Sequence, residues 1–475
     1  MSDYRYGILL QGRVSEWLKD IISEYKVNFP YAHIVLSTWN TENVDDIDCE
    51  IIQNKLPTQT QPHKNTTNHQ IIGINAGLKK INSDIVLRCR TDQFIHNKKI
   101  FELYEDYCSP EKIMVPDVGT IIDDDYRLSD FCQIAKKEVL ENFWNNIPLY
   151  DGKHAVSPEI YLAKNYVVNV MNDCNPWKQV IKKYFHIMKY HSDFQIEFEK
   201  LDLHEKYSRY YDQIKHVEQI KNNDRQFIIR SHFFQSQKSR IEFSQKYTNG
   251  KVLFSSYGVN MQYVCSKQLL ESGCNEIWHR NNFEDDLCLR KINSKNNIEY
   301  ESKMNINDVN ENNFDSILSF EEIQFHKDPN SLIRKYEKML KSNGVLILST
   351  NNKIPNKIIK NNDIENTGLS KMELIKIIET VFPVLEKFSQ GDISKMELVD
   401  SSFEGGIYNL KKMGKKIFDK LDRKTVFYKS YLQSSALKSR EKKYEKMRID
   451  FKPIPLENEQ NPLYFLMICK KNIIR

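Results

Sequence analysis

The chain has 475 residues, 40% of them hydrophobic and 28% charged, with a formal net charge of +5. A chain of this length exceeds one ordinary hydrophobic core, so two or three domains are expected. Basic residues are interspersed with acidic ones, which argues against a nucleic-acid-binding protein. No segment has the roughly 20 apolar residues of a membrane-spanning helix. Without a signal-peptide pattern, and with nine unpatterned cysteines, the chain is expected to be cytoplasmic with reduced thiols.

The N-terminal part alternates apolar runs with helical patterns. Strands are expected at 6–10, 33–39, 49–54, 84–89, 113–116 and 128–134, and helices at 14–27, 68–82 and 136–145. Strands that alternate with helices are typical of a parallel sheet.

A second α/β pattern starts at Gly250, after a charged, helix-like stretch at 176–245. Its expected strands are 251–257, 276–279, 314–320, 344–350 and 462–469, and its expected helices are 259–272, 329–341, 370–382 and 410–450. The sequence therefore predicts an α/β protein with two Rossmann-like domains. The expected bounds are 1–180 for the first domain, 181–245 for a helical connecting segment and 246–475 for the second domain.

The most informative stretch is residues 84–92, a short apolar run that ends in Arg90, Thr91 and Asp92. The carboxyl end of a buried strand is where an open α/β sheet places its ligand crevice. A carboxylate there can hold a divalent cation, which in turn can bind a diphosphate. This pattern indicates a nucleotide-sugar site.

Other polar residues fall at the ends of neighbouring strands. Gln11 and Gly12 follow the first strand, and Thr38 ends the second. Asn68 and Gln70 begin the following helix, whose N-terminus offers free N–H groups to an anion. Trp39 could stack on a base, although a single tryptophan is more often a core residue.

Six segments occur in the order and rough spacing of one known family: LLQGRVS, IVLSTW, NHQIIGINAGL, LRCRTD, RLSDFCQIA and SPEIYL. On these motifs, residues 5–170 resemble the WavE lipopolysaccharide-synthesis family, whose members look like glycosyltransferases of the GT-A type. The resemblance implies that Arg90, Thr91 and Asp92 replace a DxD motif, with Asp92 binding Mn²⁺ or Mg²⁺ or the diphosphate. The donor-binding candidates are Gln11, Gly12, Thr38, Asn68, Gln70, Arg90, Thr91 and Asp92. Asp130 and Glu159 would face the sugar and the acceptor, and either could deprotonate the acceptor hydroxyl.

Each of these candidates also has a structural interpretation. Asp130 could cap a turn, Glu159 could be a first-turn helix acid, and Arg90–Asp92 could be a structural ion pair. The triplet Asp123–Asp125 is better explained as a solvated acidic turn than as a metal site. The chain departs from the usual family pattern at His69, where arginine is usual, and at Arg13, where proline is common.

The second half resembles class I S-adenosylmethionine-dependent methyltransferases, on the segments FDSILSFEEIQFH and MLKSNGVLILSTN. The glycine-rich loop of that fold lets the backbone approach the cofactor, but the loop at 254–260 holds one glycine. The second strand should be followed by an acid for the ribose hydroxyls. Here it is followed by Arg280, and Glu284 comes too late. Asp308 matches the position of the adenine-side acid, but the pattern favours a domain that does not bind S-adenosylmethionine.

Residues 411–447 are rich in lysine and arginine, which indicates a solvated helix face or, alternatively, peripheral contact with an anionic membrane. The sequence thus predicts a glycosyltransferase that moves a sugar from a nucleotide-sugar to a glycan or lipid-linked oligosaccharide acceptor. The second domain would serve docking, oligomerisation or acceptor binding. Two alternatives remain: a bifunctional glycosyltransferase–methyltransferase, and a non-catalytic assembly protein of a glycan-synthesis complex. The sequence leaves the oligomeric state open.

Overall fold

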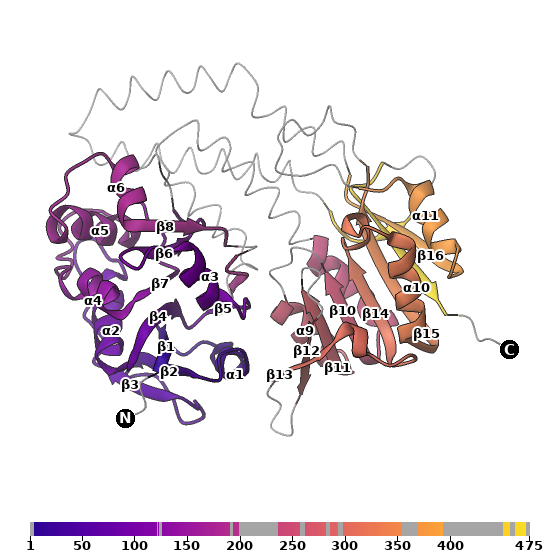
Figure 1. Ribbon diagram of the computed structural model, residues 1–475, viewed down its shortest axis with the longest axis horizontal. Helices are drawn as coiled ribbons and strands as arrows, with labels where there is room; N and C mark the ends of the chain where they lie inside the picture. Colours follow the sequence, from indigo (N-terminus) through magenta and orange to yellow (C-terminus); the bar gives the residue numbers. More distant parts are fainter. Residues whose placement is uncertain are drawn as a thin grey trace, which may run out of the picture. The chain divides into compact units, whose positions relative to one another are not determined.

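The computed structural model describes most of the chain and divides it into two compact units, an N-terminal one and a C-terminal one (Figure 1). The residues that it describes are 4–120, 122, 126–190, 193–198, 236–256, 262–281, 286–292, 298–353, 368–392, 450–456 and 461–471. Both units contain a sheet with parallel strands and packed helices, so the expected α/β fold class with Rossmann-like sheets is confirmed.

The first unit is built on a seven-stranded sheet of order β3-β2-β1-β4-β7-β6-β8. The strands β3, β2, β1 and β4 are parallel, β7 runs antiparallel to β4, and β8 is parallel to β6. The strand bounds are β1 Tyr4–Gln11, β2 Ala32–Trp39, β3 Glu50–Asn54, β4 Ser83–Arg90, β6 Ile113–Pro116, β7 Cys132–Lys136 and β8 Phe185–Met188. A separate two-stranded sheet pairs β5, Gln93–Ile95, with β9, Ile196–Phe198.

Successive side chains of a strand point to opposite faces of the sheet, and helices pack against the apolar ones. Leu9 of β1 faces α2, where Gly77 lets the helix approach the sheet closely. The hydroxyl of Tyr25 on α1 accepts a hydrogen bond from the Ile95 N–H of β5 at 3.0 Å. The helix bounds are α1 Leu18–Asn28, α2 Thr67–Lys80, α3 Ile100–Tyr107, α4 Lys137–Asn145, α5 Pro158–Lys164 and α6 Trp177–Tyr184, with a π-helix, η1, at Asn165–Val170.

Gly77→Ala should destabilise the first unit by about 1–3 kcal/mol, because overpacking a filled core forces side chains to move. A Cβ at this position would lie 2.2 Å from Cδ1 of Leu9, which is fully buried. Chemical denaturation of the variant measures the loss. Lys79→Ala on the exposed side of the same helix is the control and should change stability by less than about 0.5 kcal/mol. Equal stability of the two variants would contradict the close contact.

Two expectations for the first unit need correction. The first domain extends past the predicted boundary at residue 180, because β8 pairs with β6 and β9 pairs with β5. These strands have four and three residues, so the charged residues around them hid the apolar pattern. The strand expected at 128–134 begins later, at Cys132.

The second unit contains a nine-stranded sheet of order β13-β12-β11-β10-β14-β15-β18-β16-β17. Here β11, β10, β14 and β15 are parallel, while β12 is antiparallel to β11 and β18 is antiparallel to both β15 and β16. The strand bounds are β10 Gly250–Ser256, β11 Cys274–Asn281, β12 Asp286–Ile292, β13 Ile298–Asn305, β14 Phe314–Phe320, β15 Leu340–Asn351, β16 Val384–Gln390, β17 Ile454–Pro455 and β18 Tyr464–Lys470.

The helices of the second unit are α9 Gln262–Glu271, α10 Pro329–Met339 and α11 Lys371–Glu379, with short 3₁₀ turns at η3 Gln245–Tyr247, η4 Ile306–Asp308 and η5 Ile323–Phe325. Residues 236–244 are also helical. Helix α10 begins where Asp328 accepts a hydrogen bond from the Ser331 N–H at 3.1 Å, and Pro329 fills the first position. The five strands and the helices expected at 259–272, 329–341 and 370–382 are confirmed in kind, while β12, β13, β16 and β17 were not predicted. The basic stretch 411–447 lies outside the described residues.

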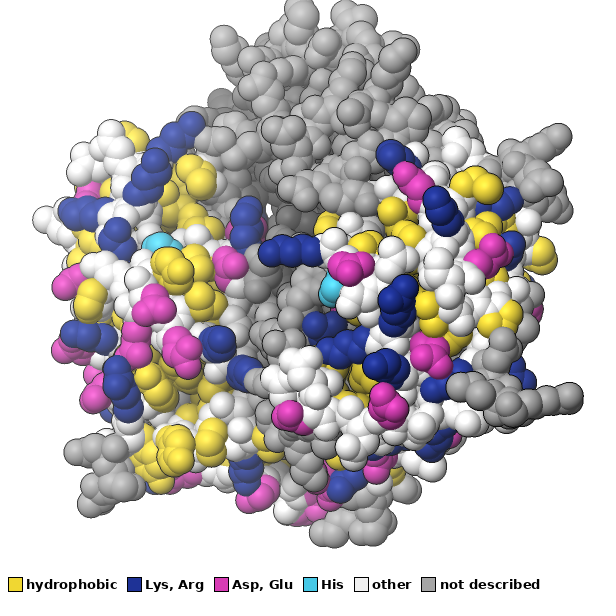
Figure 2. All heavy atoms as spheres, turned by 45° about the vertical axis from the view of Figure 1, so that its right-hand side comes forward, with side chains coloured by type: hydrophobic (Ala, Val, Ile, Leu, Met, Phe, Trp, Pro, Cys, Tyr) yellow, Lys and Arg dark blue, Asp and Glu magenta, His cyan; other side chains and the backbone are white. Residues whose placement is uncertain are grey.

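Figure 2 shows lysine and arginine side chains interspersed with aspartate and glutamate on the face it presents. This mixture follows from the nearly balanced charge of the chain. Among the described residues, no helix combines the length and the apolar character needed to cross a membrane.

Candidate functional site

In the sheet of the first unit, the strand order reverses between β1 and β4. From β1 the chain proceeds outward to β2 and β3, and it then returns to place β4 on the other side of β1. Gln11, at the end of β1, stands in register with Ser37 on β2 and Arg90 on β4. Ligands of open α/β sheets bind at such a switch point, outside the carboxyl ends of the strands.

Two loops meet at this point and hold each other in place. Gly12 has a φ of +148°, and a Cβ on it would lie 2.6 Å from Oγ1 of Thr91. The Thr91 hydroxyl donates to the carbonyl of Arg13 at 2.6 Å, and Ser15 donates to the carbonyl of Thr91 at 2.5 Å. The predicted residues Gly12 and Thr91 are therefore in contact, and glycine is required by both the backbone angle and the space.

The buried residue Arg88 was not among the predicted site residues, but it contacts three of them. Its Nη1 donates to the main-chain carbonyl of Asp130, and its Nη2 lies 3.5 Å from the amide oxygens of both Gln11 and Gln70. Gln70 in turn donates from Nε2 to Oδ2 of Asp130 at 2.6 Å. The predicted residues Gln11, Gln70 and Asp130 thus converge on one face of the sheet.

Arg88 is fully buried and its guanidinium lies 5.4 Å from the ring of Trp144. Burial lowers its pKa to about 10, and the nearby Asp130 partly opposes this shift. Arg88 therefore remains charged at neutral pH. A signal for it existed in the sequence: Arg88 and Arg90 are two positions apart, so they share a face of β4.

Arg90 and Asp92 form a bidentate pair after β4. Arg90 donates from Nε to Oδ1 of Asp92 at 2.8 Å and from Nη2 to Oδ2 at 2.6 Å. The guanidinium carbon lies 5.5 Å from the ring centre of Phe131, and the Arg90 side chain is 32% exposed. The pair is thus a structural ion pair that also leaves part of a guanidinium exposed at the carboxyl end of β4.

The remaining first-half candidates are buried or partly buried. Asn68 both donates to and accepts from the main chain of Tyr150, at 2.9 and 2.7 Å, so its amide anchors that loop. Thr38 is fully buried, and Trp39 packs against His69 with 5.4 Å between ring centres, as a core residue. Glu159 is buried in the first turn of α5. The nucleotide role of Asn68 and Thr38 and the catalytic role of Glu159 stay predictions.

A divalent cation at Asp92 is implied by the family resemblance, but the residues present do not fit one. Both carboxylate oxygens of Asp92 already accept from Arg90. A cation of this class prefers several oxygen ligands, and no group of three or more histidine, cysteine, aspartate or glutamate side chains suited to a metal occurs among the described residues. The triplet Asp123–Asp125 lies outside them.

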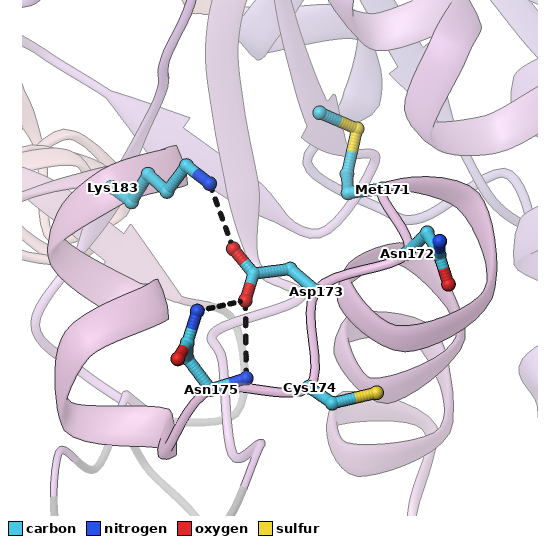
Figure 3. A pocket seen from close by; sticks show the side chains of 6 residues that line it. All are labelled: Met171, Asn172, Asp173, Cys174, Asn175 and Lys183. Carbon is cyan, nitrogen blue, oxygen red and sulfur yellow. Dashed lines mark hydrogen bonds and ion pairs between the residues drawn. The ribbon is translucent and has the colours of Figure 1, made fainter.

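The hollow in Figure 3 is a different feature of the first unit. It has a volume of about 440 Å³ and is lined by Met171, Asn172, Asp173, Cys174, Asn175 and Lys183. Asp173 accepts from Lys183 at 2.8 Å and from Tyr184 at 2.9 Å, which holds the pKa of its carboxyl well below the usual range. The aspartate thus ties the end of η1 to α6, and none of the predicted site residues lines the hollow.

In the second unit, a buried ion pair lies where S-adenosylmethionine was expected to bind. Arg280, at the end of β11, donates to Glu322 at 2.5 Å, and Ser255 at the end of β10 donates to the same carboxylate at 2.6 Å. Tyr336 donates to it as well. Because β10 lies between β11 and β14, these contacts span the carboxyl end of β10.

These residues do not fit S-adenosylmethionine. Arg280 stands where a ribose-binding acid is expected, and a guanidinium cannot accept a hydrogen bond from a hydroxyl. Asp308, the residual candidate, lies exposed in the turn η4. The second unit therefore has a Rossmann-like sheet, but its own side chains lie across the carboxyl end of β10, where the cofactor was expected.

The fold and the site together define an α/β protein whose first sheet carries a cluster of polar and arginine side chains at its switch point. Residues 15–247 match the family model described as WavE lipopolysaccharide synthesis, which confirms the resemblance that the sequence motifs of the N-terminal part indicated. No curated protein matches this chain.

Solved structures that resemble the chain cover about half of it. A SAM-dependent methyltransferase of Thermotoga maritima is 10% identical over 52% of this chain and 98% of its own, with a TM-score of 0.27. One of Archaeoglobus fulgidus is 13% identical over 51% and 95%, with a TM-score of 0.26. The [4+2]-cyclase SpnF is 12% identical over 49% and 80%, with a TM-score of 0.25. Likenesses of this size carry no argument about activity.

Proposed function

We propose that the first unit is a glycosyltransferase of lipopolysaccharide or related surface-glycan synthesis, using a nucleotide-sugar donor. The observation that carries this proposal is the convergence of Gln11, Gln70, Asp130 and the Arg90–Asp92 pair at the carboxyl ends of β1 and β4. Charged and amide side chains at a switch point are suited to a nucleotide and its diphosphate. The family match supports the biosynthetic context.

The chemistry is the replacement of the diphosphate on the sugar by an acceptor hydroxyl. The bond from the anomeric carbon to the diphosphate oxygen breaks, and a bond from that carbon to the acceptor oxygen forms. The hydroxyl proton passes to a carboxylate, for which Asp130 is the first candidate and Glu159 the second. Arg90 offers its charge to the leaving diphosphate. The acceptor would be a glycan or a lipid-linked oligosaccharide at the cytoplasmic side of the membrane.

A thermal-shift scan tests the donor site. A panel of nucleotide-sugars is added to the full chain, with and without Mn²⁺, and the stabilising donor is then offered with lipopolysaccharide fragments while transfer is followed by mass spectrometry. We expect one donor to raise the unfolding temperature of the wild type, and we expect Asp92→Ala to weaken this response. If no donor stabilises the wild type, or if Asp92→Ala responds equally, the proposal fails.

For the second unit we propose a non-catalytic role in docking, oligomerisation or acceptor binding. The buried contacts of Glu322 with Arg280 and Ser255 support this role. Calorimetric titration of the full chain with S-adenosylmethionine should show no binding heat. Micromolar binding would contradict the proposal and favour a bifunctional enzyme.

A further inference from the structure

The side chains of Arg90 and Asp92 bind each other, and this contact limits how either residue could bind the donor diphosphate. Arg90 is the last residue of β4 and Asp92 lies in the turn that follows, and both oxygens of the carboxylate accept from the guanidinium, at 2.8 and 2.6 Å. Such fork-to-fork pairs are strong and directional. A cation that used Asp92 as a ligand would have to displace a charged partner that the local sequence supplies.

The other acid at this crevice is also engaged. Asp130 is 8% exposed, and its Oδ2 accepts from Gln70 at 2.6 Å. Asp92 and Asp130 therefore do not form an open pair of carboxylates among the described residues, and no larger metal-binding group is found there.

Positive charge, in contrast, is concentrated at the same strand ends. Arg88 is fully buried next to the amides of Gln11 and Gln70, and the main chain of Arg13 is held by the hydrogen bond from Thr91 to its carbonyl. Arg90 lies at the end of β4 with a third of its side chain exposed. The ring of Phe131 at 5.5 Å and the carboxylate of Asp92 fix the orientation of its guanidinium.

We propose that Arg90 binds the donor diphosphate directly, without a divalent cation, and that Asp92 is a positioning residue for Arg90 and not a metal ligand. This inference rests on the proposed function, because it specifies how that donor site recognises its diphosphate. The class of ligand is a nucleoside diphosphate carrying a sugar. A planar guanidinium suits this ligand, since it can donate two parallel hydrogen bonds to phosphate oxygens.

The test is a calorimetric titration of the full chain with UDP, GDP and CDP and with the matching monophosphates, in EDTA and in Mn²⁺. We expect at least one diphosphate to bind equally well in both conditions and more tightly than its monophosphate. Arg90→Gln should weaken diphosphate binding by about 10- to 100-fold, the range of hydrogen bonds to charged groups. It should also remove the preference for diphosphate over monophosphate, a change that a merely structural role would not produce.

Two further variants complete the design. Asp92→Asn should weaken diphosphate binding less than Arg90→Gln, and Mn²⁺ should not alter its affinity. Arg5→Gln is the matched control, because it removes a guanidinium from an ion pair with Glu105 near the opposite end of β1; its affinities should equal those of the wild type. Arg90→Lys keeps the positive charge but removes the planar guanidinium, and it replaces Arg90→Gln if the latter does not fold.

The outcomes separate the two proposals. If EDTA abolishes diphosphate binding and Mn²⁺ restores it, the metal-free inference is overturned while the donor site survives. If Arg90→Gln binds like the wild type, the role of Arg90 is overturned. If no diphosphate binds in either condition, the donor site itself is overturned.

Discussion

Replacing His96 with glutamine should lower the free energy of unfolding of the first unit by about 3–5 kcal/mol, the cost of breaking a buried charge network. His96 follows β5, and its two ring nitrogens lie 2.7 Å from Oε1 of Glu24 on α1 and 2.8 Å from Oε2 of Glu197 on β9. All three side chains are at most 3% exposed. Glutamine would leave two buried carboxylates facing a neutral group.

Urea denaturation of the full chain followed by tryptophan fluorescence measures this loss. Four of the five tryptophans, Trp17, Trp39, Trp144 and Trp177, lie in the first unit. His33→Gln is the matched control, because His33 pairs with Glu50 at 2.7 Å but at a more exposed position, 16% and 38%. Exposed pairs contribute about 0–1 kcal/mol. Equal losses in the two variants would contradict a special role of the buried network.

The same network makes stability depend on pH. Burial alone would lower the pKa of His96, but the carboxylates of Glu24 and Glu197 outweigh it and raise the pKa to about 9. A pKa raised above its unfolded value of about 6.5 contributes stability that is complete below that pH and is lost as the pH rises through 9. The loss is about 3 kcal/mol, because a tenfold change in proton affinity corresponds to about 1.4 kcal/mol. Wild-type stability that stays constant between pH 6.5 and 9, or an equal slope in His96→Gln, would refute this assignment.

The sequence predicts the sheets well because their signals are local. The strands around Leu9 and Val86 contain short uninterrupted apolar runs, and the helices between them keep a regular apolar spacing. The short strands β5, β8 and β9 carry no such signal, since each has three or four residues and polar residues interrupt or flank its apolar ones. They form because tertiary partners pair with their backbone.

That polar residues gather at the carboxyl ends of β1 and β4 was predictable, but their contacts were predictable only in part. Strand ends identify Gln11 and Thr91 as neighbours, the family resemblance adds Asp130, and register brings Gln11 beside Arg90. The sequence could not show that Arg88 reaches both amides from beneath, because this depends on the sheet face shared with Gln11. It also could not show that Arg90 occupies both oxygens of Asp92, a contact decided by side-chain geometry.

Asp130→Asn should lower the rate of sugar transfer by about 10²–10⁴-fold, the usual contribution of a general base, while the affinity for the donor stays unchanged. Asp130 lies directly before Phe131 and β7, close to the crevice, and its carboxylate is oriented by Gln70 at 2.6 Å while Arg88 holds its main-chain carbonyl. An asparagine oxygen can still accept from Gln70, so the fold should persist. The variant thus removes the proton acceptor and retains the geometry.

Glu159→Gln is the comparison that assigns the base. Because Asp130 belongs to the network at the switch point and Glu159 lies on α5, we expect the larger loss of turnover from Asp130→Asn. Turnover is measured with the donor that stabilises the wild type, and urea denaturation confirms that both variants fold. A large loss in Glu159→Gln alone would move the base to α5. If neither variant loses turnover, the proton must pass to another group, and the carboxylate of Asp130 would then serve only to position Gln70.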